Sequence, residues 1–326
     1  MAAVVPPIEP MLAQLARTLP EGDDLSYEPK WDGFRCLSFG GDLHSRNERP
    51  LTRYFPEVVD ALAPLGDVVL DGELVSAAGF VPLMARLHPA ASRVALLAEQ
   101  TPATYVAFDV LAVGDEDLQR TPFVQRRSRL EQLVAGTQAQ LTTTTRDAAE
   151  AAGWLTAPSG SGIDGVMVKD DGLLYEPGRR AMVKVKHLRT ADCVVGGVRV
   201  HADGGVGSML LGCWDGDVLR HVGVAASLAK ALRQEVRAEL APLVTSLQGH
   251  PWEQGFGVEG GALGRLKGTG GRWVPGMTQD WLPVRPERVA EVSYDHVEGW
   301  KFRHPGRCVR WRLDRDPRSC TVEQLT

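Results

Sequence analysis

The most constraining feature of this chain is an eight-residue run near its start, residues 28–35, which reads EPKWDGFR. It places Lys30 just before an Asp32-Gly33 pair and ends on Arg35. Because an Asp-Gly pair is typical of a tight turn between two strands, we expect it to orient the lysine and leave the arginine for phosphate or sugar. A lysine amine attacks phosphorus only when neutral, and a cationic or apolar pocket favours the neutral form. The alternative is a surface hairpin with an exposed lysine and arginine.

The length and composition suit a protein of two domains. The chain has 326 residues, of which 44% are hydrophobic, enough for two cores. No stretch resembles a signal peptide, and no apolar run is long enough to span a membrane. The five cysteines are scattered without a CxxC pair. This spacing argues against a disulfide framework or a zinc ribbon and favours a reducing cytoplasm.

The overall charge gives little support for a nucleic-acid-binding protein. The formal net charge is −5 at pH 7 and the isoelectric point is about 5.9. The charge is uneven, however, because residues 301–312 read KFRHPGRCVRWR and combine basic with aromatic side chains. A local patch of this kind is sufficient for phosphate contact. The alternative is an ordinary solvated strand face.

In the first half of the chain, polar residues interrupt apolar strands. Residues 68–75 form an apolar run broken by Asp-Gly-Glu. Carboxylates inside an apolar strand are costly unless they are used, so we expect Glu73 to face a site rather than the core. Residues 105–111 predict another strand, which contains Phe108. The apolar spacing also predicts helices over residues 53–65, 80–97 with a break at 88–89, 123–134 and 147–155.

Two further strands carry charged residues at informative positions. Residues 163–169 form a strand with Asp164 at its mouth. Residues 182–187 alternate, so Lys184 and Lys186 share one face of the sheet. Two lysines on one sheet face suit a polyanion.

The pattern of predicted elements changes at residues 189–192. Short strands with one helix between them fit a small five-stranded barrel of the oligonucleotide-binding type, although a barrel without a ligand is the alternative. We therefore predict an α+β protein with domains over residues 1–189, built of antiparallel sheets with flanking helices, and over residues 190–326, the barrel. The predicted elements of the barrel are strands 193–200, 207–214, 218–224, 288–298 and 307–313, helix 226–240 and a Gly-rich loop 255–271.

Taken together and in order, these segments resemble the ATP-dependent DNA ligases. The chain looks most like the small stand-alone bacterial type and the ligase module of multifunctional bacterial end-joining ligases, and the likeness runs from residue 27 to about residue 317. It implies a nucleotidyltransferase (adenylation) domain followed by an OB-fold barrel. The last motif, residues 312–315, is called the terminal motif below. The matching motifs are KWDGFR at 30–35, SRN at 45–47, LDGE at 70–73, FD at 108–109, DGVMVK at 164–169, KVK at 184–186 and RLDR at 312–315.

The resemblance implies a role for each matching position. Lys30 would carry AMP as a phosphoramidate, Glu28 would read the adenine edge through its backbone, and Phe108 would stack on the adenine. Glu73 would hold the ribose and is grouped with Asp164 as a ligand of Mg²⁺ or Mn²⁺. The remaining positions would contact phosphate: Arg35 and Arg46 the nucleotide and the nicked DNA, Lys184 and Lys186 the α-phosphate, and Arg312, Asp314 and Arg315 the pyrophosphate leaving group.

Two positions depart from the family pattern. Asp164 stands where the family usually has glutamate, one methylene longer, so the metal would be held through water or the strand would sit closer. Arg315 stands where the family often has lysine. The charge is kept, but the geometry of a guanidinium differs from that of an ammonium.

The implied reaction has three steps. Neutral Lys30 attacks ATP and releases pyrophosphate, AMP passes to the 5′-phosphate of a DNA nick, and the 3′-hydroxyl then expels AMP and seals the strand. Because the barrel must close on ATP and then clamp DNA, we expect a mobile linker near residues 187–192. The expected partner is nicked double-stranded DNA, and the protein is expected to be a cytoplasmic monomer.

Other functions stay open at the level of sequence. An RNA-capping guanylyltransferase shares the lysine motif and the barrel, but the sequence around Trp311 resembles that of DNA ligases. An RNA ligase is disfavoured by the basic terminal barrel. An NAD-dependent ligase is disfavoured because this chain has no zinc cysteines and too few residues before Lys30 for a nicotinamide-binding domain. A catalytically dead nucleic-acid-binding module conflicts with the intact set of Lys30, Glu73, Lys184 and Lys186.

Overall fold

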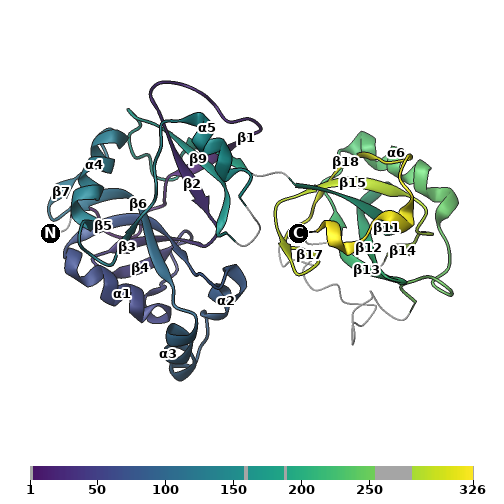
Figure 1. Cartoon of the computed structure of the whole chain (residues 1–326), viewed down its shortest axis with the longest axis horizontal. Helices are drawn as coiled ribbons and strands as arrows, with labels where there is room; N and C mark the ends of the chain where they lie inside the picture. Colours follow the sequence, from purple (N-terminus) through teal and green to yellow (C-terminus); the bar gives the residue numbers. More distant parts are fainter. Residues whose placement is uncertain (1–2, 158–160, 187–188, 254–280, 326) are drawn as a thin grey trace. The chain divides into compact units, whose positions relative to one another are not determined.

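The computed structural model describes residues 3–157, 161–186, 189–253 and 281–325. The chain divides into two compact units, Met1–His187 and Leu188–Thr326, called unit 1 and unit 2 below. Unit 1 is drawn in purple to teal and unit 2 in green to yellow in Figure 1. The division lies two residues before the expected boundary at residue 189. No helix in the described ranges is long and apolar enough to cross a membrane.

Unit 1 is built on two sheets. In the first, of order β1-β10-β9-β2, β1 runs parallel to β10 and the other neighbours are antiparallel. Its strands are Leu12–Ala16, Arg180–Lys186, Ile163–Asp170 and Leu25–Trp31. The second sheet has the order β4-β3-β5-β6-β7, and β8 (Gln140–Leu141) lies beside β6. Its strands are Asp42–Ser45, Phe34–Phe39, Val68–Val75, Thr104–Val113 and Glu116–Asp117.

Side-chain alternation along the strands separates the layers of unit 1. On β5, Val68 and Leu70 pack in a core with residues of α1 and α4, whereas Val69 packs on the other face with Met182 of β10. The core that includes Val69 therefore lies between the two sheets. Helix α5 covers the first sheet through Ala151. The helices of unit 1 are α1 (Pro56–Leu62), α2 (Phe80–Ala85), α3 (Ala91–Gln100), α4 (Phe123–Val134) and α5 (Ala148–Trp154).

Unit 2 is a curled antiparallel sheet with the strand order β13-β12-β11-β15-β18. Its two ends meet at Gly306, just before β18, where Gly306 donates to the carbonyl of Val224 and accepts from the N–H of Ala226. The closure produces the small barrel that the sequence predicts. The elements are β11 (Arg189–Val200), β12 (Val206–Asp215), β13 (Val218–Ala225), helix α6 (Lys230–Leu240), β14 (Leu282–Pro283), β15 (Val289–Tyr294), the pair β16 (Val297–Glu298) and β17 (Lys301–Phe302), and β18 (Arg307–Trp311).

Several expected boundaries move for local reasons. The helix predicted over 53–65 becomes 3-10 turns on either side of α1, because prolines occupy the starts of α1 and of the second turn and lack the N–H that would continue a helix. The helix predicted over 226–240 begins only at Lys230. The strand predicted over 288–298 is interrupted between β15 and β16. The Gly-rich loop 255–271 lies outside the described residues.

One expectation about connections is confirmed and another is wrong in part. The Asp32-Gly33 turn joins two strands as expected, and the alternative of a surface hairpin is excluded because β2 and β3 belong to different sheets and do not pair. Residues 189–192, expected in a mobile linker, are the start of β11 and pair with β15 from Arg189 onward. The pairing with β15 fixes this stretch as a strand, and the local sequence alone did not reveal that partner.

Candidate active site

A cavity of about 190 Å³ opens between strands of both sheets of unit 1. Strands β1, β2, β9 and β10 contribute one part of its wall, and β3, β5 and β6 contribute the other. The sequence-predicted residues that line it are Glu28, Lys30, Arg35, Arg46, Glu73, Phe108 and Lys184.

The turn at Gly33 brings both ends of the lysine motif to this cavity. A Cβ atom on Gly33 would lie 2.0 Å from the carbonyl oxygen of Leu74, so the chain passes β5 at a distance that only glycine permits. Because β2 and β3 enter different sheets, Lys30 and Arg35 reach the cavity from opposite layers. The motif therefore serves as a connection between sheets rather than as a surface turn.

Three charged residues of the first sheet form a cluster, called the lysine–aspartate cluster below. Lys30 Nζ lies 2.7 Å and Lys186 Nζ 3.3 Å from Oδ2 of Asp164. The strand register explains the meeting, because β9 lies between β2 and β10 and pairs next to Asp164 with both. All three side chains are partly buried, with 12% of the Asp164 side chain exposed. A single carboxylate oxygen thus holds the amine of Lys30 in place.

Lys184, two residues before Lys186 on β10, lines the cavity. Burial lowers its pKa, and the positive charges of Lys30, Lys186 and Arg46 lower it further. The cavity end of the first sheet is therefore strongly cationic, which suits a ligand carrying several negative charges.

Comparisons with known proteins agree with this geometry. A family model described as "ATP dependent DNA ligase domain" matches residues 10–186, and one described as "ATP dependent DNA ligase C terminal region" matches residues 202–315. The chain is 48% identical to DNA ligase C2 of Mycolicibacterium smegmatis, over 99% of this chain and 95% of that protein. It is also 48% identical to DNA ligase C of Mycobacterium tuberculosis, over 99% and 94%.

The chain belongs to the ATP-dependent DNA ligases. It is a covalent nucleotidyltransferase of this family, and its reaction is the ATP-dependent sealing of nicks in DNA. Among solved structures, one from a study of Lig E DNA ligases covers 93% of this chain and 99% of its own, with 16% identity and a TM-score of 0.55. At that identity the likeness concerns the fold alone.

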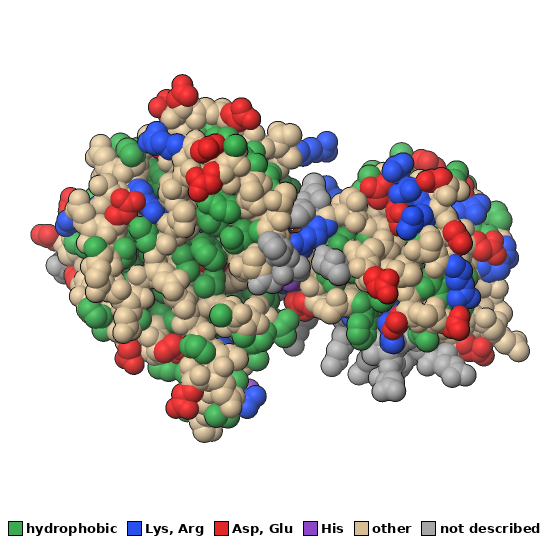
Figure 2. All heavy atoms as spheres, viewed as in Figure 1, with side chains coloured by type: hydrophobic (Ala, Val, Ile, Leu, Met, Phe, Trp, Pro, Cys, Tyr) green, Lys and Arg blue, Asp and Glu red, His purple; other side chains and the backbone are tan. Residues whose placement is uncertain are grey.

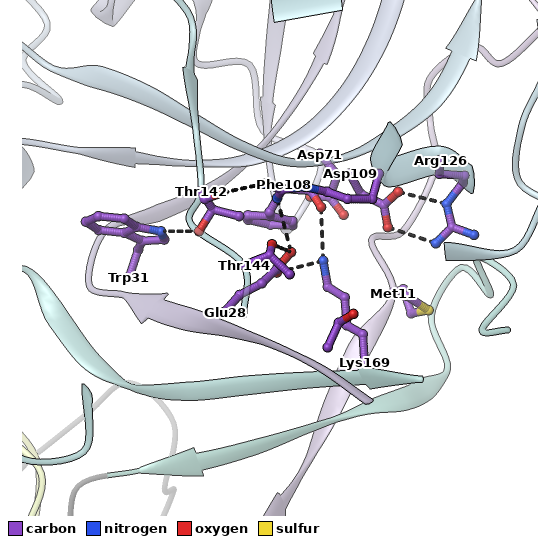
Figure 3. A network of polar contacts seen from close by, with 12 residues as sticks. Met11, Glu28, Trp31, Asp71, Phe108, Asp109, Arg126, Thr142, Thr144 and Lys169 are labelled. Atoms are coloured by element: carbon purple, nitrogen blue, oxygen red, sulfur yellow. Dashed lines mark hydrogen bonds and ion pairs between the residues drawn. The ribbon is translucent and has the colours of Figure 1, made fainter. Parts of the chain in front are cut away.

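The Glu28 side chain of this ligase belongs to a buried polar network in the cavity wall (Figure 3). It is 2% exposed and pairs with Lys169 Nζ at 2.8 Å. Lys169 also donates to the carbonyl of Phe108 at 3.0 Å, and its ammonium lies 5.0 Å from the Phe108 ring centroid. Arg127 Nη1 lies 3.6 Å from the same Glu28 carboxylate. The network fixes both the strand that carries Lys30 and the aromatic ring expected beneath adenine.

Arg35 is less available for phosphate than the sequence suggests. Its Nε and Nη2 atoms each lie 2.5 Å from an oxygen of Asp71, and Nη2 also donates to the carbonyl of Met11 at 3.1 Å. Asp71 is fully buried and accepts a further hydrogen bond from the Tyr175 hydroxyl at 2.7 Å. Burial by itself lowers the pKa of Arg35, but the Asp71 carboxylate raises it overall. The Arg35 guanidinium also lies over the Phe108 ring, 4.6 Å from its centroid.

Glu73 faces the cavity as the interrupted strand predicted. Burial raises the pKa of Glu73 to about 7, against the opposing effect of the positive charges of Arg35 and Lys30. At neutral pH both forms of the Glu73 side chain are therefore populated, the protonated acid that can donate a hydrogen bond and the ionised carboxylate. Among the described residues, no group of three or more His, Cys, Asp or Glu side chains is arranged to hold a metal ion.

The terminal motif lies in unit 2, where carboxylates hold its arginines. Arg312 Nε and Nη2 donate to Asp314 at 3.0 and 2.9 Å. This hydrogen bonding lowers the pKa of Asp314 to about 2. Positive and negative side chains intermingle over unit 2 on the face drawn in Figure 2. The basic segment 301–312 follows this pattern, because Arg303 lies 3.8 Å from Glu298 and Arg310 lies 2.7 Å from Glu291.

Sequence reasoning missed three residues that shape these sites. Lys169 stood inside a quoted motif but received no role, and Asp71 was recognised only as costly in a buried strand. Asp192, which contacts the terminal motif, gave no signal because its partners lie about 120 residues away in the chain. Such partners become visible only when the strand register is known.

Proposed function

We propose that Lys30 is the nucleophile that carries AMP in this DNA ligase. The observation that carries the proposal is the 2.7 Å contact between Lys30 Nζ and Asp164 at the edge of a cationic cavity. Asp164 orients the Lys30 amine, and the surrounding cations favour its attack on ATP because they attract and neutralise the phosphates. In the first step the nitrogen of neutral Lys30 forms a bond to the α-phosphorus of ATP, the bond to the β-phosphate oxygen breaks, and pyrophosphate leaves.

The cavity suits the nucleoside part of ATP. Its volume of about 190 Å³ is below the roughly 300 Å³ at which pockets for whole drug-sized ligands begin, so the phosphates would extend toward the lysines outside it. Phe108 offers its ring to the adenine from one sheet, and Glu28 lines the cavity from the other. In this arrangement Glu73 holds the ribose, and Lys184 and Lys186 neutralise the α-phosphate.

Arg35 and Arg46 have separate duties in this proposal. Because Asp71 holds the Arg35 guanidinium over Phe108, Arg35 supports the adenine platform and offers only its remaining N–H groups to the nucleotide. Arg46 lines the cavity and contributes to the positive field around Lys184. We assign to Arg46 the larger share of the phosphate contact of the nicked DNA.

The carboxylates of the site fit a divalent cation such as Mg²⁺ or Mn²⁺. Mg²⁺ is usually bound by one or two carboxylates together with substrate phosphates and water, and Asp164 and Glu73 supply such oxygens. The metal would neutralise charge on the phosphates of ATP. Because Lys30 and the metal would share Asp164, loss of positive charge from Lys30 and metal binding favour each other.

The later steps use the same site on a DNA substrate. AMP passes from Lys30 to the 5′-phosphate of a nick, and the 3′-hydroxyl then attacks that phosphate and displaces AMP. Arg312, Asp314 and Arg315 orient pyrophosphate in the first step. We place the reaction in the cytoplasm and assign it to a single copy of the chain acting on nicked double-stranded DNA.

Intact-mass measurement tests the proposal. The protein is first treated with pyrophosphate to remove any AMP already bound, then incubated with Mg²⁺ and either ATP or GTP. We expect a mass gain of one AMP with ATP, its loss in Lys30→Ala, and its retention in Lys230→Ala, a control lysine at the start of α6. An AMP adduct that persists in Lys30→Ala would exclude Lys30 as the nucleophile, and a GMP adduct in place of the AMP adduct in the wild type would exclude the preference for ATP.

A further inference from the structure

Asp192 contacts both arginines of the terminal motif. Its two carboxylate oxygens accept from Arg312 Nη1 at 3.1 and 3.0 Å, and its Oδ2 lies 3.6 Å from Arg315 Nε. The Asp192 side chain is 12% exposed, whereas those of Arg312 and Arg315 are 20% and 42% exposed. A partly buried carboxylate thus anchors two more exposed cations.

Asp192 is itself held from both sides of its backbone. Gln324, in the C-terminal turn 322–324, accepts from the N–H of Asp192 at 2.9 Å and donates to its carbonyl at 3.0 Å. On the other edge of β11, Asp192 pairs with Glu291 of β15. The register between β11 and β12 begins only at Val194, so the Gln324 amide takes the place of a strand partner at Asp192. The carboxylate therefore projects from a rigid backbone.

The contacts divide the Arg312 guanidinium between two carboxylates. Asp314 takes Nε and Nη2 on one edge, and Asp192 takes Nη1 on the other. Hydrogen bonding to Asp314 and the charge of Asp192 raise the pKa of Arg312, so it stays a cation. Asp314 is mostly exposed, with 69% of its side chain accessible, whereas Asp192 is mostly buried. Of the two carboxylates, Asp192 is the one with a fixed position.

We propose that Asp192 is a positioning residue for the first step of the reaction, which sets the orientation of Arg312 and Arg315 toward the pyrophosphate leaving group. The inference rests on the role proposed above for the terminal motif. A guanidinium held in place before reaction loses less freedom when it meets the leaving group, and this raises the rate of the step that expels pyrophosphate. Sealing of a nick that already carries AMP releases no pyrophosphate, so it does not need Asp192.

The test separates the two steps. Single-turnover formation of the Lys30 adduct from ATP is compared with sealing of a pre-adenylated nick in the absence of ATP. For Asp192→Asn we expect adduct formation at saturating ATP to slow ~10-fold and sealing to stay within ~2-fold of wild type. The matched control is Glu291→Gln. Glu291 lies opposite Asp192 on β15, and its carboxylate pairs with Arg310. It is expected to leave adduct formation within ~2-fold.

A double variant distinguishes positioning from a structural effect. In an Arg312→Ala background, Asp192→Asn is expected to slow adduct formation by less than ~2-fold, because the arginine that is hydrogen-bonded to Asp192 is already gone and only the longer 3.6 Å contact with Arg315 is left to lose. Asp192→Glu keeps the charge and is expected to restore the rate to within ~3-fold of wild type. If Asp192→Asn does not fold, Gln324→Ala is measured instead, and a ~3-fold slowing of adduct formation alone is expected because the charges remain.

Other outcomes overturn the inference. Equal slowing of both steps, additive effects of Asp192→Asn and Arg312→Ala, no recovery in Asp192→Glu, or unchanged adduct formation in Asp192→Asn would each exclude it. For Gln324→Ala the excluding results are an unchanged rate of adduct formation or slowing of both steps. These results differ from failure of the proposed function, in which the wild-type protein forms no AMP adduct on Lys30 or Arg312→Ala forms it at the wild-type rate.

Discussion

In each unit an aspartate at a proposed functional motif is shared by two cations, and the two pairs of cations differ in their chemistry. In unit 1, Asp164 holds Lys30 and Lys186 beside a cavity. In unit 2, Asp192 holds Arg312 and Arg315 near the surface. A lysine amine can lose its proton and form a covalent bond, whereas a guanidinium keeps its charge throughout the accessible pH range. The first cluster is therefore suited to nucleophilic attack and the second to fixed charge stabilisation.

The largest expected effect comes from making the unit 1 cluster resemble the unit 2 cluster. Lys30→Arg retains the charge and the contact with Asp164 but removes the group that can be deprotonated, so we expect adduct formation to fall more than ~10³-fold. Intact mass after incubation with ATP measures it. An AMP adduct formed at more than a tenth of the wild-type rate would contradict this chemical difference between the two clusters.

Removing the shared carboxylate of unit 1 tests its role as the anchor of the nucleophile. Asp164→Asn leaves the two lysines without their common anion, and we expect adduct formation to slow ~10²-fold, a typical cost of losing one electrostatic partner. Asp164→Glu, the residue usual in the family, is the control and is expected to stay within ~10-fold of wild type. If the asparagine variant reacts as fast as the glutamate variant, the Asp164 charge is not needed.

The carboxylates near the two clusters are expected to respond to pH in opposite directions. The pKa of Glu73 rises from 4.5 in the unfolded chain to about 7 in the folded protein. Between those values the folded state keeps a proton that the unfolded state has lost, so this group's contribution to stability falls as pH rises from 4.5 to 7. The pKa of Asp314 is lowered from 3.8 to about 2, so this group's contribution to stability is lost as pH falls from 3.8 to about 2.

Glu73→Gln removes this pH dependence. We expect the free energy of unfolding of the variant, taken relative to that of wild type, to be about 3 kcal/mol larger at pH 8 than at pH 4, because the variant has no buried charge to form. Urea unfolding of both proteins at the two pH values measures the change. Asp314→Asn is the control from unit 2, and its difference from wild type is expected to be the same at pH 4 and pH 8. A gain for Glu73→Gln that does not depend on pH would argue against the raised pKa.

The smallest expected effect comes from replacing an arginine of the unit 2 cluster with lysine, the reverse of Lys30→Arg. Arg315→Lys keeps the charge at a position that lies 3.6 Å from Asp192, and the family often has lysine there, so we expect adduct formation to change less than ~3-fold. Arg312→Lys is the comparison, since an ammonium cannot reproduce the paired contacts to Asp314, and a larger loss is expected. Single-turnover adduct formation measures both, and equal losses would mean that the two arginines are equivalent.

The sequence predicted most of the fold and most of the cavity wall. Strand β5 was recognised because its apolar run is interrupted by acids, and β10 because its two lysines alternate with apolar residues. The turn at residues 32–33 was predicted, but the entry of its two strands into different sheets was not, because a tight turn has the same local signature whether its strands pair or enter separate sheets. Which sheet each strand joins depends on contacts far along the chain.

The residues of the cavity and their order along the chain are properties of the sequence alone, because residue type sets which atoms can attack, bind or stay charged. Tertiary structure decided which groups share a partner. It placed Asp164 between two lysines, gave the donors of Arg35 to Asp71, and raised the pKa of Glu73 by burial. It also brought Asp192 to Arg312 through the pairing of β11 with β15 and of β15 with β18. Distances and desolvation arise only when strands distant in sequence are packed together, and these two quantities determine the electrostatics of the site.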